Sequence, residues 1–100
     1  MSAYVILFRE SPVRDPEAMR KYRESPRPPE LFEKMKVRVA YGAQIAIEGE
    51  PPDGVIVLEF PTMEDAKAWY YSPDYQKAAV FRLQAADFRG VIVEGFEPPA

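Results

Sequence analysis

The stretch VIVLEFPTMEDAKAWYYSPDYQKAAVFR, residues 55–82, places a strand pattern directly before an interrupted helix pattern. VIVLEF (55–60) is apolar on both alternating sets of positions except at Glu59, which is typical of a strand covered on both faces. Thr62 then opens a helical pattern, and Ser72 restarts it because Ser is a favoured N-cap residue. The stretch therefore predicts a central strand followed by a helix in two segments.

Further strand patterns lie on both sides of this stretch. AYVILFRE (3–10) is apolar on both alternating sets, and FRGVIVEGF (88–96) reads as a last strand. KVRVAYGAQIAIE (36–48) alternates apolar and polar residues, which predicts a strand covered on one face, with a bend at Gly42. A helix over DPEAMRKYRE (15–24) completes the order β-α-β-β-α-β.

This order predicts an α+β fold, a ferredoxin-like βαββαβ sandwich with a four-stranded antiparallel sheet in the order 4-1-3-2. We expect one domain over residues 1–100. The first and third strands, which are apolar on both faces, take the two central places. Because both helices cover the same sheet face, the other apolar face needs a second cover. We therefore expect a homodimer packed sheet against sheet.

The composition narrows the class of function. The net charge is −3 and Lys and Arg are scattered, which argues against nucleic acid as a partner. The chain has no Cys and no His, so thiolate nucleophiles, imidazole triads and their metal sites are excluded, and we expect no metal and no cofactor. It lacks both a basic leader and an apolar run of about 18 residues. We expect a cytoplasmic protein with no membrane partner.

Arg82 is the most unusual residue of the helix pattern. At about 100° per residue it lies roughly 20° from Tyr75, inside the apolar stripe. A buried arginine keeps its charge and needs partners. It could pair with Glu59 or Glu94, which interrupt apolar strands, or reach the surface along its methylenes. It could instead bind the carboxylate or phosphate of a ligand, which its planar fork suits. The pattern leaves these alternatives open.

Three aromatic residues of the same helix are candidates for a pocket wall. Trp69, Tyr70 and Tyr75 follow helical spacing, which favours a core position, but buried Tyr hydroxyls need partners and one of them could reach a cavity. The core is therefore the favoured position, and we keep all three as candidate ligand-binding residues beside Arg82. Glu59 could orient Arg82 or act as a base if burial raises its pKa; a structural salt bridge is the alternative.

The segment EFPTMEDAKAWYYSPDYQKAAVFR, residues 59–82, resembles the signature of domain-of-unknown-function family 1330. The signature residues here are Glu59, Phe60, Pro61, Ala66, Trp69, Tyr70, Ser72, Pro73, Tyr75, Gln76 and Arg82. The similarity continues to DPE near the start of the chain and VEG near its end. The resemblance implies a homodimer that forms a dimeric α/β barrel.

The chain departs from the resembled family around its second strand. Members usually carry Gly-Gly-Arg before this strand and Arg-Gly-Gly within it, where this chain reads KMKVR and AYGAQ and retains only Gly42. Gly42 joins the candidate ligand-binding residues on this basis, and the polarity of a pocket there could differ from that of the family.

Two functions from different classes are compatible with these sequence features. The first is a dimer that binds a small acidic or aromatic molecule between helix 62–86 and the sheet, with Arg82 as the anchor. Cofactor-independent catalysis on such a molecule stays open, and the sequence does not decide whether the protein is an enzyme. The alternative is a non-catalytic structural or regulatory dimer with a vestigial pocket. A module that binds partners at the edge strand 36–48 is a third reading.

Overall fold

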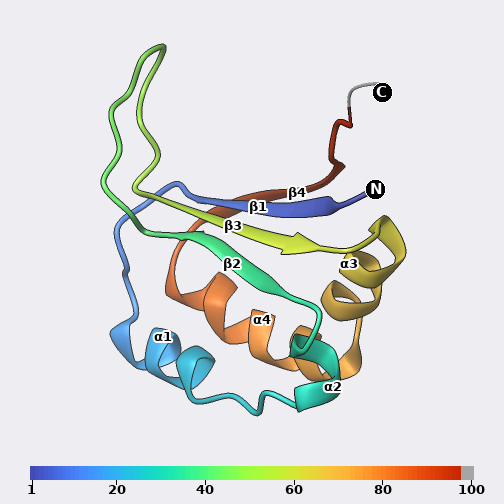
Figure 1. The fold of residues 1–100 in the computed structure, drawn as a ribbon. Helices are drawn as coiled ribbons and strands as arrows, with labels where there is room; N and C mark the ends of the chain where they lie inside the picture. The colour runs from blue at the N-terminus through green and yellow to red at the C-terminus, as the bar shows by residue number, and fades with distance from the viewer. Residues whose placement is uncertain (98–100) are drawn as a thin grey trace.

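The computed structural model describes residues 1–97 and has the predicted α+β architecture (Figure 1). Its elements are β1 (Ala3–Arg9), α1 (Pro16–Arg23), α2 (Pro29–Phe32), β2 (Lys36–Ala40), β3 (Gly54–Phe60), α3 (Met63–Tyr70), α4 (Pro73–Ala85) and β4 (Phe88–Glu94). The strands form one antiparallel sheet in the order β2-β3-β1-β4, with the helices on one side of it. The predicted ferredoxin-like strand order is confirmed.

The two faces of the sheet have different covers. Along β1, Ala3, Val5 and Leu7 are buried beneath the helices, whereas the alternate residues face the other way. The strand register extends this second set across β3 and β4. We call it the helix-free face; its residues are Tyr4, Ile6, Phe8, Val55, Val57, Glu59, Arg89, Val91 and Val93. Most of these side chains are apolar, so one face of the sheet presents an apolar surface without a helix over it.

The last two helices begin at the residues that the sequence predicts. The hydroxyl of Thr62 accepts a hydrogen bond of 3.1 Å from the backbone N–H of Asp65 and starts α3. The hydroxyl of Ser72 accepts one of 3.1 Å from the N–H of Tyr75 and starts α4. Such caps satisfy donors that the first helical turn leaves unpaired. Within residues 1–97, no helix is long and apolar enough to cross a membrane.

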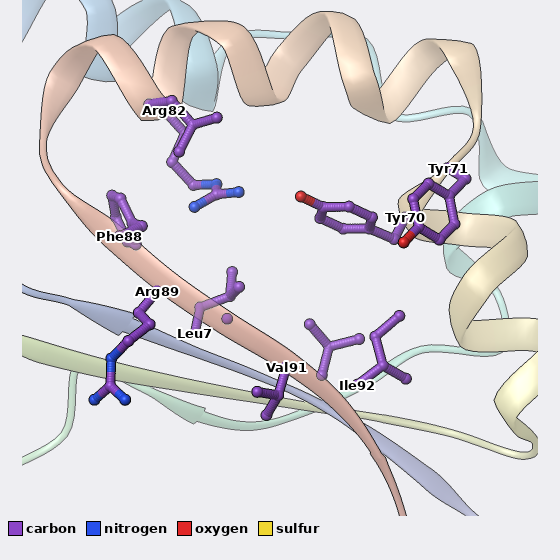
Figure 2. A pocket seen from close by; sticks show the side chains of 11 residues that line it. Leu7, Tyr70, Tyr71, Arg82, Phe88, Arg89, Val91 and Ile92 are labelled. Atoms are coloured by element: carbon purple, nitrogen blue, oxygen red, sulfur yellow. The ribbon is translucent and has the colours of Figure 1, made fainter.

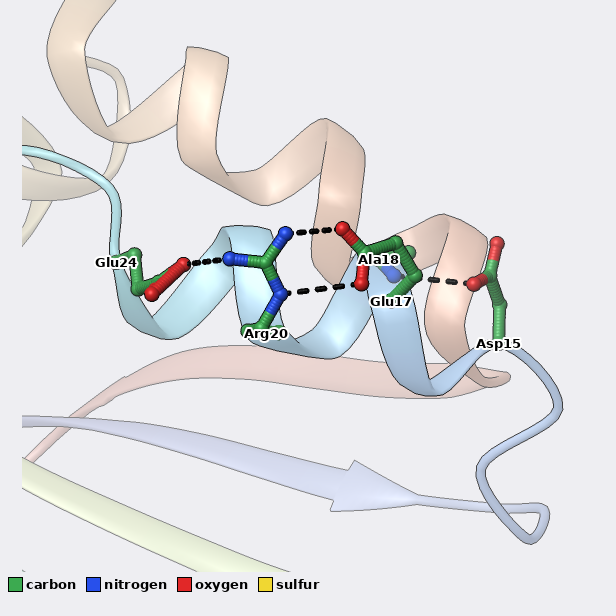
Figure 3. A network of polar contacts seen from close by, with 5 residues as sticks. All are labelled: Asp15, Glu17, Ala18, Arg20 and Glu24. Carbon is green, nitrogen blue, oxygen red and sulfur yellow. Dashed lines mark hydrogen bonds and ion pairs between the residues drawn. The ribbon is translucent and has the colours of Figure 1, made fainter.

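Helix α1 carries its own charge network on the exposed side. The Asp15 carboxylate caps the helix by accepting from the Ala18 N–H at 3.0 Å, and Arg20 bridges Glu17 and Glu24 (Figure 3). These carboxylates and the guanidinium are about half exposed, so solvent screens the pairs and they add little stability.

The core lies between the sheet and the break that separates α3 from α4. Trp69 is buried there, with its ring centroid 4.1 Å from that of Tyr75 and 5.5 Å from that of Phe60. Three large rings from one strand and two helices thus share a single cluster. This packing fixes how α3 and α4 lie on the sheet, because each ring contributes a large buried apolar area.

The predicted strand over residues 36–48 is wrong beyond Ala40. Tyr41 has a φ of 57°, a left-handed conformation that ends β2. The irregularity of the strand is a register shift between Val37 and Val39, not a bend at Gly42. Residues 41–53, which we call the arm, project beyond the sheet on the side away from the helices (Figure 1).

Candidate functional site

A cavity of about 250 Å³ lies between α4, β4 and the end of α3 (Figure 2). It opens to solvent beside β4, which is an edge strand. Most of its lining residues are apolar, and the polar side chains are those of two Tyr and two Arg residues. The lining consists of Val5, Leu7, Tyr70, Tyr71, Arg82, Leu83, Phe88, Arg89, Gly90, Val91 and Ile92. This size accommodates a molecule of about one ring, because pockets for drug-sized ligands begin near roughly 300 Å³.

Arg82 forms the polar centre of the cavity. Its side chain is only 2% exposed, and its buried Nε has no hydrogen-bond partner. No carboxylate of residues 1–97 lies within 4.0 Å of its guanidinium nitrogens. Figure 2 shows the guanidinium in the space below α4, with the hydroxyl of Tyr70 directed towards it from the far side. The cavity therefore contains a desolvated positive charge without a counterion from the described chain.

The position of Arg82 on α4 follows from helical periodicity. It shares the buried stripe of the helix with Tyr75, Ala78 and Ala79. The long arginine side chain reaches from this stripe into the cavity. Its Cζ sits 4.7 Å from the ring centroid of Phe88, the first residue of β4. This cation–π contact offsets part of the desolvation cost but provides no hydrogen-bond acceptor.

Glu59 lies apart from this cavity. It belongs to the helix-free face, and its Oε1 accepts from Nε of Arg38 at 2.7 Å. The ion pair between Glu59 and Arg82 considered from the sequence is therefore not formed. The hydrogen bond from Arg38 holds the pKa of Glu59 below its ordinary value, although desolvation opposes this shift. A lowered pKa makes the carboxylate a weaker base, so the structure does not favour Glu59 for proton abstraction. Glu94 does not pair with Arg82 either.

Trp69 and Tyr75 lie in the core behind the cavity, whereas Tyr70 lines it. The Tyr75 hydroxyl lies 3.0 Å from that of Tyr22 on α1, so this buried phenol has a partner within the protein. Burial raises the pKa of Tyr75, and the contact with Tyr22 raises it further, while the nearby Arg82 cation opposes both. Of the three aromatic candidates, Tyr70 alone presents its polar group to the cavity.

Gly90 lines the cavity, whereas Gly42, the glycine chosen from the sequence, does not. Gly42 lies in the arm, where a Cβ would meet nothing within 4 Å, and it does not line the cavity. Gly90 does line it, and a Cβ there would lie 2.7 Å from Cδ2 of Leu7. Sequence reasoning overlooked Gly90, although a glycine inside the apolar strand FRGVIVE signals a close approach.

The lining groups favour recognition over proton transfer. The titratable residues of the cavity are Tyr70, Tyr71, Arg82 and Arg89, none of them a carboxylate. Among residues 1–97, no group of three acidic side chains could hold a metal ion. Two phenols and a buried guanidinium can donate hydrogen bonds to an anion, while the apolar walls accommodate a hydrophobic body.

The fold and the cavity define a small ferredoxin-like α+β protein in which, within residues 1–97, Arg82 is the buried cation and faces a side-opening pocket. The chain belongs to the family described as Domain of unknown function (DUF1330), whose sequence model matches residues 2–96. The predicted family is therefore confirmed. No curated protein matches the chain significantly.

Solved structures share this fold at low sequence identity. A protein of unknown function from Rhodopseudomonas palustris is 23% identical, with a TM-score of 0.64 over 97% of this chain and 84% of its own. A dimeric ferredoxin-like protein of unknown function from Jannaschia sp. CCS1 is 16% identical, with a TM-score of 0.69 over 95% of this chain and 100% of its own. A dimeric protein from Bacteroides fragilis with a ferredoxin-like fold is 18% identical, with a TM-score of 0.58 over 94% and 96%.

Proposed function

We propose that the protein binds a small molecule carrying an anionic group on an aromatic body, and that it does so as a homodimer. Arg82 receives the carboxylate or phosphate, Tyr70 donates a further hydrogen bond, and Phe88 and Ile92 contact the ring. The proposal covers binding; chemistry on the bound molecule would need a proton acceptor that the cavity lining lacks.

The state of Arg82 is the single observation that carries this proposal. A cation buried to 2% exposure with an unpaired Nε costs several kcal/mol unless something compensates it. A ligand carboxylate bound to the guanidinium in the fork geometry would supply the missing negative charge. The unpaired charge accordingly lowers the stability of the free protein and raises its affinity for an anion.

The homodimer follows from the helix-free face. Ile6 and Val57 lie at its centre, and Val91 and Val93 extend it to the β4 edge. A continuous apolar surface of this kind marks an interaction site in a soluble protein. The structural relatives from Jannaschia sp. CCS1 and Bacteroides fragilis are described as dimeric, which supports a second copy as the cover.

Ligand binding is tested by measuring melting midpoints and calorimetric affinities with benzoate, 4-hydroxybenzoate and inorganic phosphate. Benzamide serves as the uncharged analogue of benzoate. We expect at least one anion to raise the midpoint of the wild type and benzamide to leave it unchanged. Arg82→Met should lower the anion affinity about 10- to 100-fold, because a charged hydrogen bond is worth about 1.5–3 kcal/mol.

Arg89→Met is the matched control for this experiment. Arg89 also borders the cavity, but its side chain is 71% exposed and pairs with Glu10 at 2.7 Å. Its loss should leave the affinity within about twofold, since solvent screens an exposed charge. Failure of every anion to bind the wild type, or equal binding by Arg82→Met, would contradict the proposal.

A structural role for Arg82 is the second candidate, favoured by its contact with the ring of Phe88. The two roles predict opposite effects of Arg82→Met on stability. An anion receptor should tolerate the change, because Met keeps the volume and removes an unpaired buried charge. A structural arginine should lose about 3 kcal/mol or more when replaced. Urea unfolding of both proteins without ligand distinguishes the two roles.

A further inference from the structure

The residues that line the cavity differ strongly in exposure, and this difference gives the cavity two ends. Val5 and Leu7 on β1 and Arg82 on α4 are each at most 5% exposed, and we call them the closed end. Tyr71, which follows α3, is 69% exposed, and Leu83 on α4 is 49% exposed; we call these two residues the mouth. The buried cation therefore lies at the closed end of the cavity and not at its mouth.

The closed end contains one positive charge, that of Arg82. The other arginine of the lining, Arg89, is exposed and pairs with Glu10 at 2.7 Å. Its Cζ lies 5.0 Å from the ring centroid of Phe8, a residue of the helix-free face. Figure 2 shows the guanidinium of Arg89 directed away from that of Arg82. Among the described residues, the lining thus offers an anion one desolvated counter-charge.

One buried cation matches one negative charge. A carboxylate is planar and singly charged, so both of its oxygens can accept from the guanidinium fork of Arg82. A second negative charge at the closed end would leave water without a partner, which is costly. The same charge at the mouth would stay hydrated and would cost little. The affinity of the cavity should therefore depend on where a ligand carries its charges.

The place of the cation also sets the direction of the ligand. The cavity has a volume of about 250 Å³, which accommodates about one ring. When the carboxylate of a benzoate occupies the closed end, its ortho positions stay near Arg82. Its para position lies farthest from the carboxylate and therefore nearest to Tyr71 and Leu83.

We propose that the cavity selects aromatic monocarboxylates, bound with the carboxylate at the closed end and the para position of the ring at the mouth. A second anionic group beside the first weakens binding, whereas one at the para position is tolerated. Aryl phosphates bind weakly because a phosphate monoester carries about two charges on one group at neutral pH. This inference rests on the anion site proposed above and names the class of ligand that the site takes.

Calorimetric titration of the wild type with two pairs of substituted benzoates tests the selection by charge. Phthalate and terephthalate carry a second carboxylate at the ortho and para positions. 2-Nitrobenzoate and 4-nitrobenzoate carry a nitro group there, which has the shape of a carboxylate without its charge. We expect phthalate to bind at least about tenfold more weakly than 2-nitrobenzoate. Terephthalate should bind within about threefold of 4-nitrobenzoate, since its second charge stays in water.

Phenyl phosphate tests the same selection without an ortho substituent. At about pH 8 its phosphate carries nearly two charges, whereas benzoate carries one. We expect phenyl phosphate to bind at least about tenfold more weakly than benzoate, because Arg82 compensates only one of these charges.

Leu83→Lys tests the direction of the ligand. Leu83 is half exposed, so a lysine there adds a cation at the mouth without disturbing the core. It should tighten terephthalate at least about threefold and leave 4-nitrobenzoate within about twofold, because only terephthalate places a charge there. Val80→Lys is the matched control: Val80 is 53% exposed on the same helix but does not line the cavity. It should change neither affinity by more than about twofold.

The results separate the anion site from its selectivity. If none of these anions binds the wild type, the anion site and its selectivity are both overturned. If benzoate binds but phenyl phosphate binds as tightly, or phthalate binds as tightly as 2-nitrobenzoate, the selection for one charge is overturned while the anion site stands. If the second carboxylate weakens terephthalate as much as phthalate, or Leu83→Lys acts no differently from Val80→Lys, the direction of the ligand is overturned.

Discussion

The Cζ atom of Arg82 lies 4.7 Å from the ring centroid of Phe88, across the short turn that joins α4 to β4. The aromatic face gives the guanidinium a favourable electrostatic neighbour without using its hydrogen-bond donors. Guanidinium N–H groups lie in the plane of the group, so a ring that faces Cζ does not take up these donors. The contact thus holds the guanidinium beside β4 without using its hydrogen-bond donors, as the proposed anion site requires.

This contact predicts a measurable coupling between the two residues. Phe88→Leu keeps an apolar side chain but removes the ring quadrupole. In a double-mutant cycle with Arg82→Met, we expect a coupling of about 1–2 kcal/mol in urea unfolding, the range for desolvated cation–π pairs. A coupling below about 0.5 kcal/mol would mean that the ring does no more than fill space.

Gly90→Ala should reduce the cavity. Its new Cβ would lie 2.7 Å from Cδ2 of Leu7, so the leucine side chain must move into the space that a ligand would occupy. We expect a stability loss of about 1–3 kcal/mol from overpacking and a weaker affinity for whichever anion binds the wild type. Calorimetric titration measures the affinity.

Gly42→Ala is the matched control for this substitution. A Cβ at Gly42 meets nothing within 4 Å, so stability should be unchanged or should rise by about 0.4–1 kcal/mol. An affinity for the anion that falls as far with Gly42→Ala as with Gly90→Ala would return Gly42 to the ligand site and contradict the assignment of the cavity wall.

Because Tyr75 is buried, the protein should lose stability at alkaline pH. Burial first, and the Tyr22 hydroxyl next, raise the pKa of Tyr75 above its ordinary value of 10.0. The folded state favours the neutral phenol, so its contribution is complete below pH 10 and is lost as the pH rises beyond the unfolded value. We expect the free energy of unfolding to stay level below about pH 9 and to fall as the pH rises above 10, and to fall less in Tyr75→Phe.

A second tyrosine limits how completely Tyr75→Phe removes this dependence. Burial also raises the pKa of Tyr41, although the Arg9 cation opposes the shift, so a smaller alkaline slope should persist. Tyr71→Phe is the control, because Tyr71 is exposed and its loss should leave the slope unchanged. Equal slopes in the wild type and Tyr75→Phe would exclude the buried phenol as the cause.

Thr62→Ala should lower stability by about 1 kcal/mol through the N-terminus of α3. It removes the cap on the Asp65 N–H and the 2.9 Å hydrogen bond that the Thr62 hydroxyl donates to the Asp65 carboxylate. That bond, followed by the contact with Lys34, holds the pKa of Asp65 below its ordinary value. Its stabilisation is present above the unfolded pKa and is lost as the pH falls.

Thr62→Ser keeps the hydroxyl and should retain most of this stability and most of the acid dependence. Thermal unfolding at pH 7 and pH 3 compares the three proteins. If Thr62→Ala loses nothing relative to Thr62→Ser at pH 7, the cap does not contribute.

Local rules of the chain account for what the sequence predicts correctly. The caps at Asp15, Thr62 and Ser72 depend on residues three positions apart, and the central placement of β1 and β3 depends on alternation within each strand. The burial of the Arg82 side chain likewise follows from helical periodicity, since the residues of one stripe point the same way whatever they contact.

The alternatives that the sequence leaves open concern contacts between elements. Glu59 pairs with Arg38 because the register of β2 on β3 brings them together, and alternation within β3 contains no information about that register. Trp69 and Tyr75 fall in the core while Tyr70 lines the cavity, because the break between α3 and α4 sets the directions of their rings.

The arm separates what the sequence determines by itself from what the tertiary structure determines. Residues 36–48 determine a strand pattern by themselves, since alternation is a property of side-chain order. The tertiary structure decided that only Lys36–Ala40 pair within the chain, because β3 supplies hydrogen-bond partners no further and Tyr41 turns the backbone away. Likewise the sequence determined that Arg82 points inward. Only the tertiary structure decided that it meets a cavity and not a carboxylate, because the turn after α4 places the ring of Phe88 beside it.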